Sequence, residues 1–312
     1  MTAVVLTAAG DGLGRRVRSL IEADPDVDRL IALDSLADVD LTELKAAFDG
    51  ASVLVHLAGD PDATRSALDA AGGAGIGHVV LLSSATVYGA WANNPVPLTE
   101  DAPLRPNPGF DFAVHAGERE RLGADWQADH PKATLAVLRP TTGVAEGDTG
   151  YLARVLRSAA RIRTGDDDPP AQFVHLDDLA AAVDVARRRR LDGPFNVAPD
   201  GWIEGEDLRA LSGGPRLRLP ERLARLRLSS APGGPAPFTV HPWVVANDRL
   251  KAVGWVASRS NEEAYVAGHR AAPWSTISPQ RRQELTLAGA GAVITGLGVG
   301  VGLALRRHLR RR

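Results

Sequence analysis

The chain has 312 residues, of which 44% are hydrophobic and 24% are charged, so it is long enough to bury a full core in one large domain or in one domain with a small lobe. Its formal net charge of -2 provides no basic field, which excludes nucleic acid as a default partner. The absence of cysteine excludes disulfides and thiolate metal sites, and it fits a reducing compartment.

Short apolar runs, rich in β-branched residues, alternate with helix-length amphipathic segments in the first half of the chain. This alternation is typical of βαβ units, so we predict an α/β fold with a doubly wound parallel sheet. The chain begins directly on the first run, without the basic and apolar segments of a secretory signal, and we therefore do not expect secretion. The predicted strands cover residues 4–6, 30–33, 53–57, 78–82 and 135–138.

Three glycines follow the first predicted strand and lead into an amphipathic helix. Gly10, Gly12 and Gly14 would let the backbone approach a pyrophosphate, which binds at the helix N-terminus in dinucleotide-binding folds. We predict that these glycines and Leu13 contact such a cofactor. Asp11 would place a carboxylate beside the phosphate oxygens, where like charges repel.

The second predicted strand ends in Asp34, twenty residues beyond Gly14. An acidic residue at this position can bind the ribose hydroxyls of NAD and repel the 2′-phosphate of NADP. We therefore expect NAD. Arg15 and Arg16 favour NADP as the alternative, and a simple turn residue at the strand end is the alternative role for Asp34.

Two segments interrupt the later part of the chain. An acidic, Pro-containing loop covers residues 165–170, and residues 229–237 have the composition of an extended connector. We assign residues 1–165 to a dinucleotide-binding core and residues 166–275 to the remaining core elements and a small C-terminal lobe.

The C-terminal segment differs from the rest of the chain. Residues 285–305 carry no charge, and residues 306–312 are rich in arginine. About 20 apolar residues span the roughly 30 Å hydrocarbon core of a bilayer, and flanking arginines favour the cytoplasmic side. We predict a transmembrane tail helix over residues 284–306 that anchors the chain at the cytoplasmic face of the cell membrane. The alternative is a soluble cytoplasmic protein whose Gly/Ala-rich helix packs on this chain or on another.

Several segments carry motifs that together resemble the extended short-chain dehydrogenase family, of the NAD-dependent epimerase/dehydratase type. The resemblance covers about residues 3–267. It implies a Rossmann-like fold, an NAD(P) cofactor, a small-molecule substrate, oxidoreductase or epimerase chemistry, and dimers formed through helices. The motifs are Val53-Leu54-Val55-His56-Leu57-Ala58-Gly59, Leu82-Ser83-Ser84-Ala85-Thr86-Val87-Tyr88-Gly89, Leu138-Arg139-Pro140, Phe173-Val174-His175-Leu176-Asp177-Asp178, Phe195-Asn196-Val197 and residues 247–255.

The resemblance assigns roles to residues at two predicted strand ends. Leu57, Ala58, Gly59 and Ser83 would run against the cofactor, and Ser84 would hydrogen-bond the reacting oxygen of the substrate. Other polar groups in the motifs are interpreted as structural.

His56 is interpreted as a structural strand residue. The adjacent acids Asp177 and Asp178 are interpreted as a helix N-cap rather than as metal ligands. We therefore predict no metal site.

The chain departs from the family pattern at the positions that carry the chemistry. The family opens a helix with Tyr-x-x-x-Lys, in which the tyrosine is the general acid or base and the lysine lowers its pKa. Phe112 and Ala116 occupy these two positions here, although the following Glu120 is retained. The family turn Thr-Gly-x-x-Gly-x-x-Gly also has Ala8 and Asp11 in place of its first two glycines.

Loss of general acid–base catalysis commonly costs about 10²–10⁴ in rate. His115 and Asp111 are candidate substitutes for the missing tyrosine, and exposed helix residues are the alternative interpretation of both. Two functions follow. One is an atypical NAD(P)-dependent oxidoreductase or epimerase in which Ser84 polarises the reacting oxygen. The other is a catalytically inactive Rossmann sensor or scaffold anchored at a membrane.

Overall fold

The computed structural model describes residues 2–36, 39–160, 162–163, 168–212, 217–218 and 234–269, which belong to one compact unit. The predicted tail helix over residues 284–306 and its basic end at residues 306–312 lie outside these described residues. Within the described residues, no helix is both long enough and apolar enough to span a bilayer.

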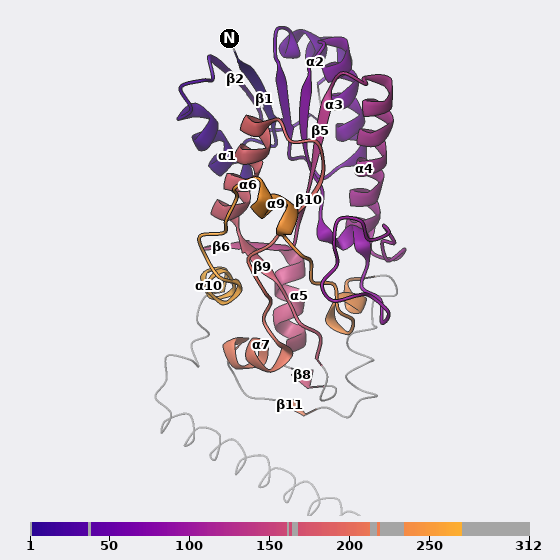
Figure 1. Cartoon of the computed structure of the whole chain (residues 1–312), viewed down its shortest axis with the longest axis vertical. Coiled ribbons are helices and arrows are strands. Elements are labelled where there is room, and N and C mark those ends of the chain that lie inside the picture. Colours follow the sequence, from indigo (N-terminus) through magenta and orange to yellow (C-terminus); the bar gives the residue numbers. More distant parts are fainter. Residues whose placement is uncertain are drawn as a thin grey trace, which may run out of the picture. The chain divides into compact units, whose positions relative to one another are not determined.

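A six-stranded parallel sheet forms the core of the unit, in the order β2-β1-β3-β4-β5-β10 (Figure 1). Because β2 and β3 lie on opposite sides of β1, the chain reverses direction across the sheet at this point. Ligands of doubly wound folds bind outside the carboxyl ends of the strands at such a switch point. The predicted α/β parallel sheet is confirmed. The strands are β1 (Ala3–Thr7), β2 (Arg29–Leu33), β3 (Val53–His56), β4 (His78–Leu82), β5 (Thr134–Pro140) and β10 (Gly193–Val197).

Helices cover both faces of the sheet (Figure 1). α1 and α6 pack together on one face, and α2, α3 and α4 pack on the other. Alternate side chains of β1 point to opposite faces of the sheet. Val4 and Leu6 join the first apolar cluster, on the side of α1 and α6, and Val5 joins the second, on the side of α2, α3 and α4. Each such buried aliphatic side chain contributes about 1.5–3 kcal/mol. The helices are α1 (Gly12–Glu22), α2 (Leu41–Phe48), α3 (Pro61–Gly73), α4 (Asp111–Asp129) and α6 (Leu176–Arg189).

Aspartates begin three of these helices. Asp11, Asp40 and Asp60 are the N-caps of α1, α2 and α3, and each carboxylate accepts a hydrogen bond from the backbone N–H three residues further on. Such a cap contributes about 1 kcal/mol to the stability of a helix.

A second group of elements packs around a separate apolar cluster that includes Phe173, Phe238 and Tyr265. Its small sheet has the order β7-β6-β9, with β6 parallel to β9 and antiparallel to β7. The elements of this part of the chain are β6 (Thr142–Ala145), β7 (Asp148–Thr149), α5 (Tyr151–Ala160), β8 (Ile162–Arg163), β9 (Phe173–His175), α7 (Gly205–Ser212), β11 (Leu217–Arg218), η2 (Ala236–Thr239) and α10 (Asn261–Ala267), and the short helix η1 (Ala85–Tyr88) follows β4. α9 (Asp248–Ala252) lies beside β10 instead, and its Leu250 joins the first apolar cluster.

The cap predicted at the paired acids Asp177 and Asp178 is wrong in position. His175 is the N-cap of α6, since its ring nitrogen accepts from the Asp177 N–H at 3.2 Å. Asp178 is buried and instead accepts from the backbone N–H of Ser258 at 2.8 Å, while Asp177 pairs with Arg16. No group of residues in the described ranges has the composition of a metal site.

His56 is fully buried and links β3 to β1 and α3. Thr64 Oγ1 donates to the Asp60 carbonyl at 2.8 Å, so it accepts from His56 Nε2 at 3.0 Å. Thr7 Oγ1 donates to His56 Nδ1 at 2.9 Å and accepts from the Leu57 N–H at 3.2 Å. A neutral ring satisfies every one of these bonds, and burial lowers the pKa of His56 to about 3. These contacts support a structural role.

His78 is held in the same way on β4. Its Nδ1 accepts from Thr134 Oγ1 at 2.8 Å and its Nε2 donates to the Ala186 carbonyl at 3.1 Å. Burial, opposed by these hydrogen bonds, lowers the pKa of His78 to about 4.

Both histidines have pKa values in the folded protein below their ordinary value of 6.5. Their contribution to stability is therefore complete above pH 6.5 and is lost as the pH falls. At about 1.4 kcal/mol per pH unit and group, the free energy of unfolding should decrease by about 4 kcal/mol between about pH 8 and about pH 5. Urea unfolding at a series of pH values measures this slope. A flat profile would contradict the prediction.

Candidate functional site

A cleft of about 530 Å³ opens at the carboxyl edge of the sheet. Its walls come from the β1–α1 turn, the loops after β4 and β5, and the first turns of α4, α5 and α6, so it lies at the switch point where ligands of this architecture bind. Among the lining residues that the structure describes, none carries a cationic side chain. They are Asp11, Gly12, Leu13, Leu82, Ser83, Ser84, Phe110, Phe112, Pro140, Thr141, Thr142, Gly143, Gly150, Tyr151, Leu152, Ala153, Leu176 and Leu179.

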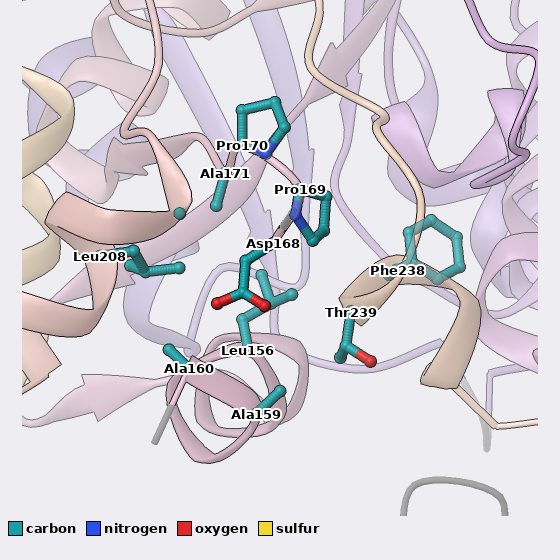
Figure 2. A pocket seen from close by; sticks show the side chains of 11 residues that line it. Leu156, Ala159, Ala160, Asp168, Pro169, Pro170, Ala171, Leu208, Phe238 and Thr239 are labelled. Carbon is teal, nitrogen blue, oxygen red and sulfur yellow. The ribbon is translucent and has the colours of Figure 1, made fainter. Parts of the chain in front are cut away.

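A smaller pocket lies between α5, α7 and η2 (Figure 2). Figure 2 shows the side chains of Leu156, Leu208 and Phe238 around it, with the carboxylate of Asp168 between them. That carboxylate forms an ion pair with Arg209 at 3.1 Å. The volume of about 30 Å³ holds one water molecule, so this pocket does not accommodate a ligand of nucleotide size.

The β1–α1 turn retains the close backbone packing of a dinucleotide turn. A Cβ atom on Gly14 would lie 1.9 Å from the Ala8 carbonyl oxygen, so only glycine fits. A Cβ atom on Gly10 would lie 3.0 Å from Asp34 Cγ, which shows that the turn and the acid at the end of β2 are adjacent. The structure thus brings together the residues that the sequence assigns to the diphosphate and to the ribose. Gly12 and Leu13 line the cleft beside them.

Ala8 occupies a backbone conformation that disfavours it. Its φ is +53°, in the left-handed region where a Cβ atom costs about 1–2 kcal/mol. The family has glycine at this position, and the chain here keeps the conformation without the residue type that fits it.

Replacing Ala8 by glycine should therefore increase the free energy of unfolding by about 1 kcal/mol, because the strain is removed and little packing is lost. Thermal and urea unfolding measure the change. The neighbouring Ala9 is buried and serves as the matched control, since Ala9→Gly should destabilise. A destabilised Ala8→Gly variant would show that the turn is not strained.

Asp11 combines two roles in this turn. It is exposed and lines the cleft, as expected from its position, but its carboxylate also accepts the Gly14 N–H as the cap of α1. The prediction from the sequence concerned only its charge. The signal for the cap was present, because aspartate is among the preferred N-cap residues.

The two serines after β4 are buried and line the cleft. Ser83 Oγ donates to the carboxylate of Glu120. Ser84 Oγ accepts from Thr86 N at 3.2 Å and from Thr86 Oγ1 at 3.0 Å, so its own hydroxyl proton stays available to a ligand. Ser84 is therefore placed where it could donate to a bound oxygen atom.

The segment Leu57, Ala58 and Gly59 follows β3 at the same edge of the sheet, but none of the three is among the cleft-lining residues. A Cβ atom on Gly59 would meet no atom within 4 Å, so the space beside it is open. Contact with a cofactor stays a prediction for these three residues.

The start of α4 shows what replaces the catalytic pair of the family. Phe112 is 50% exposed and lines the cleft, whereas Ala116 is completely buried. His115 and Asp111 are exposed, and neither lines the cleft, so the structure does not bring these candidate substitutes to Ser84.

Several cleft residues were not predicted from the sequence, among them Tyr151 at the start of α5 and Thr142 at the start of β6. Thr142 is 4% exposed, and its Oγ1 has no hydrogen-bond partner among the described residues. No local spacing could have identified either residue, because only the fold brings them beside Ser84.

A buried polar network lies behind the cleft and uses residues from four of the sequence motifs. Arg139 Nη2 pairs with Glu120 Oε2 at 2.6 Å, and Glu120 also accepts from Ser83. Arg139 Nη1 donates to the Tyr88 hydroxyl at 2.8 Å, which in turn donates to Asn196 Oδ1 at 2.8 Å. Burial raises the pKa of Tyr88 to about 12. These motif residues bind one another, and Tyr88 is not available as a substitute acid.

Arg119 places a second buried guanidinium near the cleft. It donates to the Ala58 carbonyl at 2.9 Å and to the Leu82 carbonyl at 2.8 Å, which joins the ends of β3 and β4. Burial lowers the pKa of Arg119 to about 10, so the group stays charged at neutral pH. No pattern in the sequence indicated this burial.

Removing one member of the buried ion pair should destabilise the fold strongly. Glu120→Ala leaves the Arg139 charge buried without its partner, and we expect a loss of about 3–5 kcal/mol in the free energy of unfolding. Asp125 lies on the same helix and pairs with Arg121, but both side chains are at least 60% exposed. Asp125→Ala should therefore change stability by less than about 1 kcal/mol. Equal losses in the two variants, measured by urea unfolding, would refute this account.

A parallel sheet with a glycine turn and a cleft at its switch point defines a Rossmann-type fold. The sequence pattern of the NAD-dependent epimerase/dehydratase family matches residues 12–198, which is more than half of this chain. The chain therefore belongs to that family. This confirms the family expected from the motifs. Among curated proteins, none matches the sequence significantly.

Solved structures of similar fold agree with this family. The UDP-glucose 4-epimerase of Thermus thermophilus, in complex with NAD, aligns with a TM-score of 0.65 and 17% identity over 86% of this chain and 97% of its own. The dTDP-glucose 4,6-dehydratase of Bacillus anthracis, also in complex with NAD, aligns with a TM-score of 0.63 and 12% identity over 86% of this chain and 95% of its own. The UDP-glucose 4-epimerase of Thermotoga maritima, with UDP-glucose, aligns with a TM-score of 0.65 and 16% identity over 86% of this chain and 97% of its own.

Proposed function

We propose that this chain binds a nicotinamide dinucleotide in the cleft and does not perform the acid–base chemistry of its family. The observation that carries the proposal is the position of Phe112. Its side chain has no exchangeable proton, yet it lines the cleft with Ser84 where the family has a tyrosine. Ala116, which is buried, supplies no cation in place of the lysine. The chain is thus a sensor or binding protein built on an enzyme fold.

Support for the cofactor comes from the turn and from the similar structures. Gly14 allows the contact between α1 and β1 that a bound diphosphate requires, and Asp34 lies next to Gly10, where it can accept from ribose hydroxyls. Two of the similar structures contain NAD. The nicotinamide dinucleotide would supply a hydride acceptor or donor, and this chain's own residues would hold its diphosphate and ribose. Asp11 is the one residue of the turn that opposes the fit.

The alternative of an atypical oxidoreductase or epimerase requires a substitute acid. His115 and Asp111 are exposed outside the cleft, and Tyr151 is the phenol that lines it. Turnover that depends on Tyr151 would therefore favour this alternative. The tail predicted over residues 284–306 would hold either protein at a membrane, and we retain this anchor as part of the proposal.

Calorimetric titration of NAD⁺ and NADP⁺ into the full chain tests the proposal. We expect NAD⁺ to bind at least about tenfold more tightly than NADP⁺, because Asp34 repels the 2′-phosphate. Asp34→Ala should reduce this preference. Asp26, an exposed acid that precedes β2 at its opposite end, provides the control, since Asp26→Ala should leave the preference unchanged.

The same samples are then followed at about 340 nm, where reduced nicotinamides absorb, with alcohol and carbonyl substrates. We expect no turnover. An absorbance change that disappears in Tyr151→Phe would contradict the proposed loss of catalysis. Failure of both dinucleotides to bind to the wild type and to Asp11→Gly would contradict the proposed cofactor.

A further inference from the structure

We propose that the cleft recognises an uncharged aromatic or apolar small molecule and excludes sugar nucleotides. This inference rests on the proposed function and deepens it, because it names a second class of ligand for the same cleft. The charge of the cleft walls and the exposure of two aromatic side chains carry it.

The described walls of the cleft supply no cation for a second diphosphate. Asp11 is the one charged side chain among the described lining residues, and it is an acid. Arg15 and Arg16 follow the glycine turn but do not line the cleft. In the proposed function this turn holds the diphosphate of the dinucleotide. The diphosphate of a sugar nucleotide would therefore leave water without a cationic side chain as its partner, which is unfavourable, and Asp11 would repel it.

Two exposed aromatic side chains line the cleft. Phe112 is 50% exposed and Tyr151 is 59% exposed, whereas every other phenylalanine, tyrosine and tryptophan in the described ranges is buried or half-buried. One of the two exposed rings comes from α4 and the other from α5, and both belong to the cleft. A ligand that covers this apolar surface removes it from water, which favours binding.

A packed row of aromatic rings supports the α4 side of the cleft. The ring of Phe110, which also lines the cleft, lies 5.8 Å from that of Phe112. The ring of Phe238 lies 5.4 Å from Phe110, and that of Trp243 lies 5.1 Å from Phe238. At such separations between ring centroids aromatic side chains attract one another. An aromatic ligand placed against Phe112 would extend the same row.

The size and the polar groups of the cleft fit a ligand of this class. Ser83 already donates to Glu120, whereas the hydroxyl proton of Ser84 is available. The volume of about 530 Å³ lies within the range of small-molecule sites, which are mostly apolar and contain few polar groups. The cleft therefore suits a molecule with a large apolar surface, no charge and few polar atoms.

Fluorescence titration of two matched probes into the full chain tests the inference. N-phenylnaphthylamine is neutral and aromatic, and anilinonaphthalenesulfonate has the same rings with one added sulfonate. We expect the wild type to bind the neutral probe at least about tenfold more tightly than the sulfonated probe, because the cleft has no cationic partner for the sulfonate. UDP-glucose, followed by calorimetry, should show no saturable binding.

Phe112→Lys brings a cation into the cleft and removes one of its exposed rings. We expect it to weaken binding of the neutral probe and to strengthen binding of the sulfonated probe, so that the ratio of the two dissociation constants changes at least about tenfold. A loosened fold would expose apolar surface to both probes, so opposite changes do not arise from misfolding. Val266 on α10 is 55% exposed and does not line the cleft, so Val266→Lys is the matched control and should leave both affinities unchanged within about twofold.

Equal affinities of the wild type for the two probes, or the same response to Phe112→Lys and to Val266→Lys, would overturn the inference. Saturable binding of UDP-glucose would overturn it as well. These titrations contain no dinucleotide, so their outcome is independent of the calorimetry with NAD⁺ and NADP⁺ that tests the proposed cofactor. A chain that binds neither dinucleotide but discriminates between the probes would refute the cofactor and leave the ligand class standing.

Discussion

The ion pair between Glu120 and Arg139 is the interaction on which the rest of the molecule depends. Two charges removed from water are tolerated only when they meet each other and when their remaining hydrogen-bonding groups are satisfied. Here Ser83 donates to Glu120, and Arg139 donates to Tyr88, which donates in turn to Asn196. These residues come from the other parts of the chain that meet behind the cleft. The pair therefore fixes α4, β4, β5 and β10 in one arrangement.

The residues of this network, which support the site, are different from those at the family's catalytic positions. Phe112, at the position of the family's tyrosine, lines the cleft from α4, whereas Glu120 on the same helix is buried and pairs with Arg139. Phe112 and Ala116 can thus replace a tyrosine and a lysine without disturbing the ion pair. A chain with this division can keep the fold of an enzyme, and a cleft of ligand size, after the acid–base pair is gone.

The sheet was predictable from the sequence because β1, β3 and β4 are continuous apolar runs, as strands buried on both faces must be. The family followed from motifs whose residues prove to contact one another. The sequence could not reveal the burial of Arg119, which resembles an exposed helix residue in any local pattern. Nor could it bring Tyr151 and Thr142 beside Ser84, since these contacts arise only when the second layer of elements folds against the sheet. The role of Asp11 as a helix cap was indicated locally, because aspartate is a preferred N-cap residue, but the prediction considered only its negative charge.

The guanidinium of Arg119 has a further consequence. The carbonyls of Ala58 and Leu82 lie at the ends of two neighbouring parallel strands. At the carboxyl edge of a sheet such groups are ordinarily hydrogen-bonded to water or to a ligand. Here a side chain of the protein satisfies them permanently, and Leu82 lines the cleft. The floor of the cleft is therefore preorganised, so a ligand that settles on it orders little of the backbone.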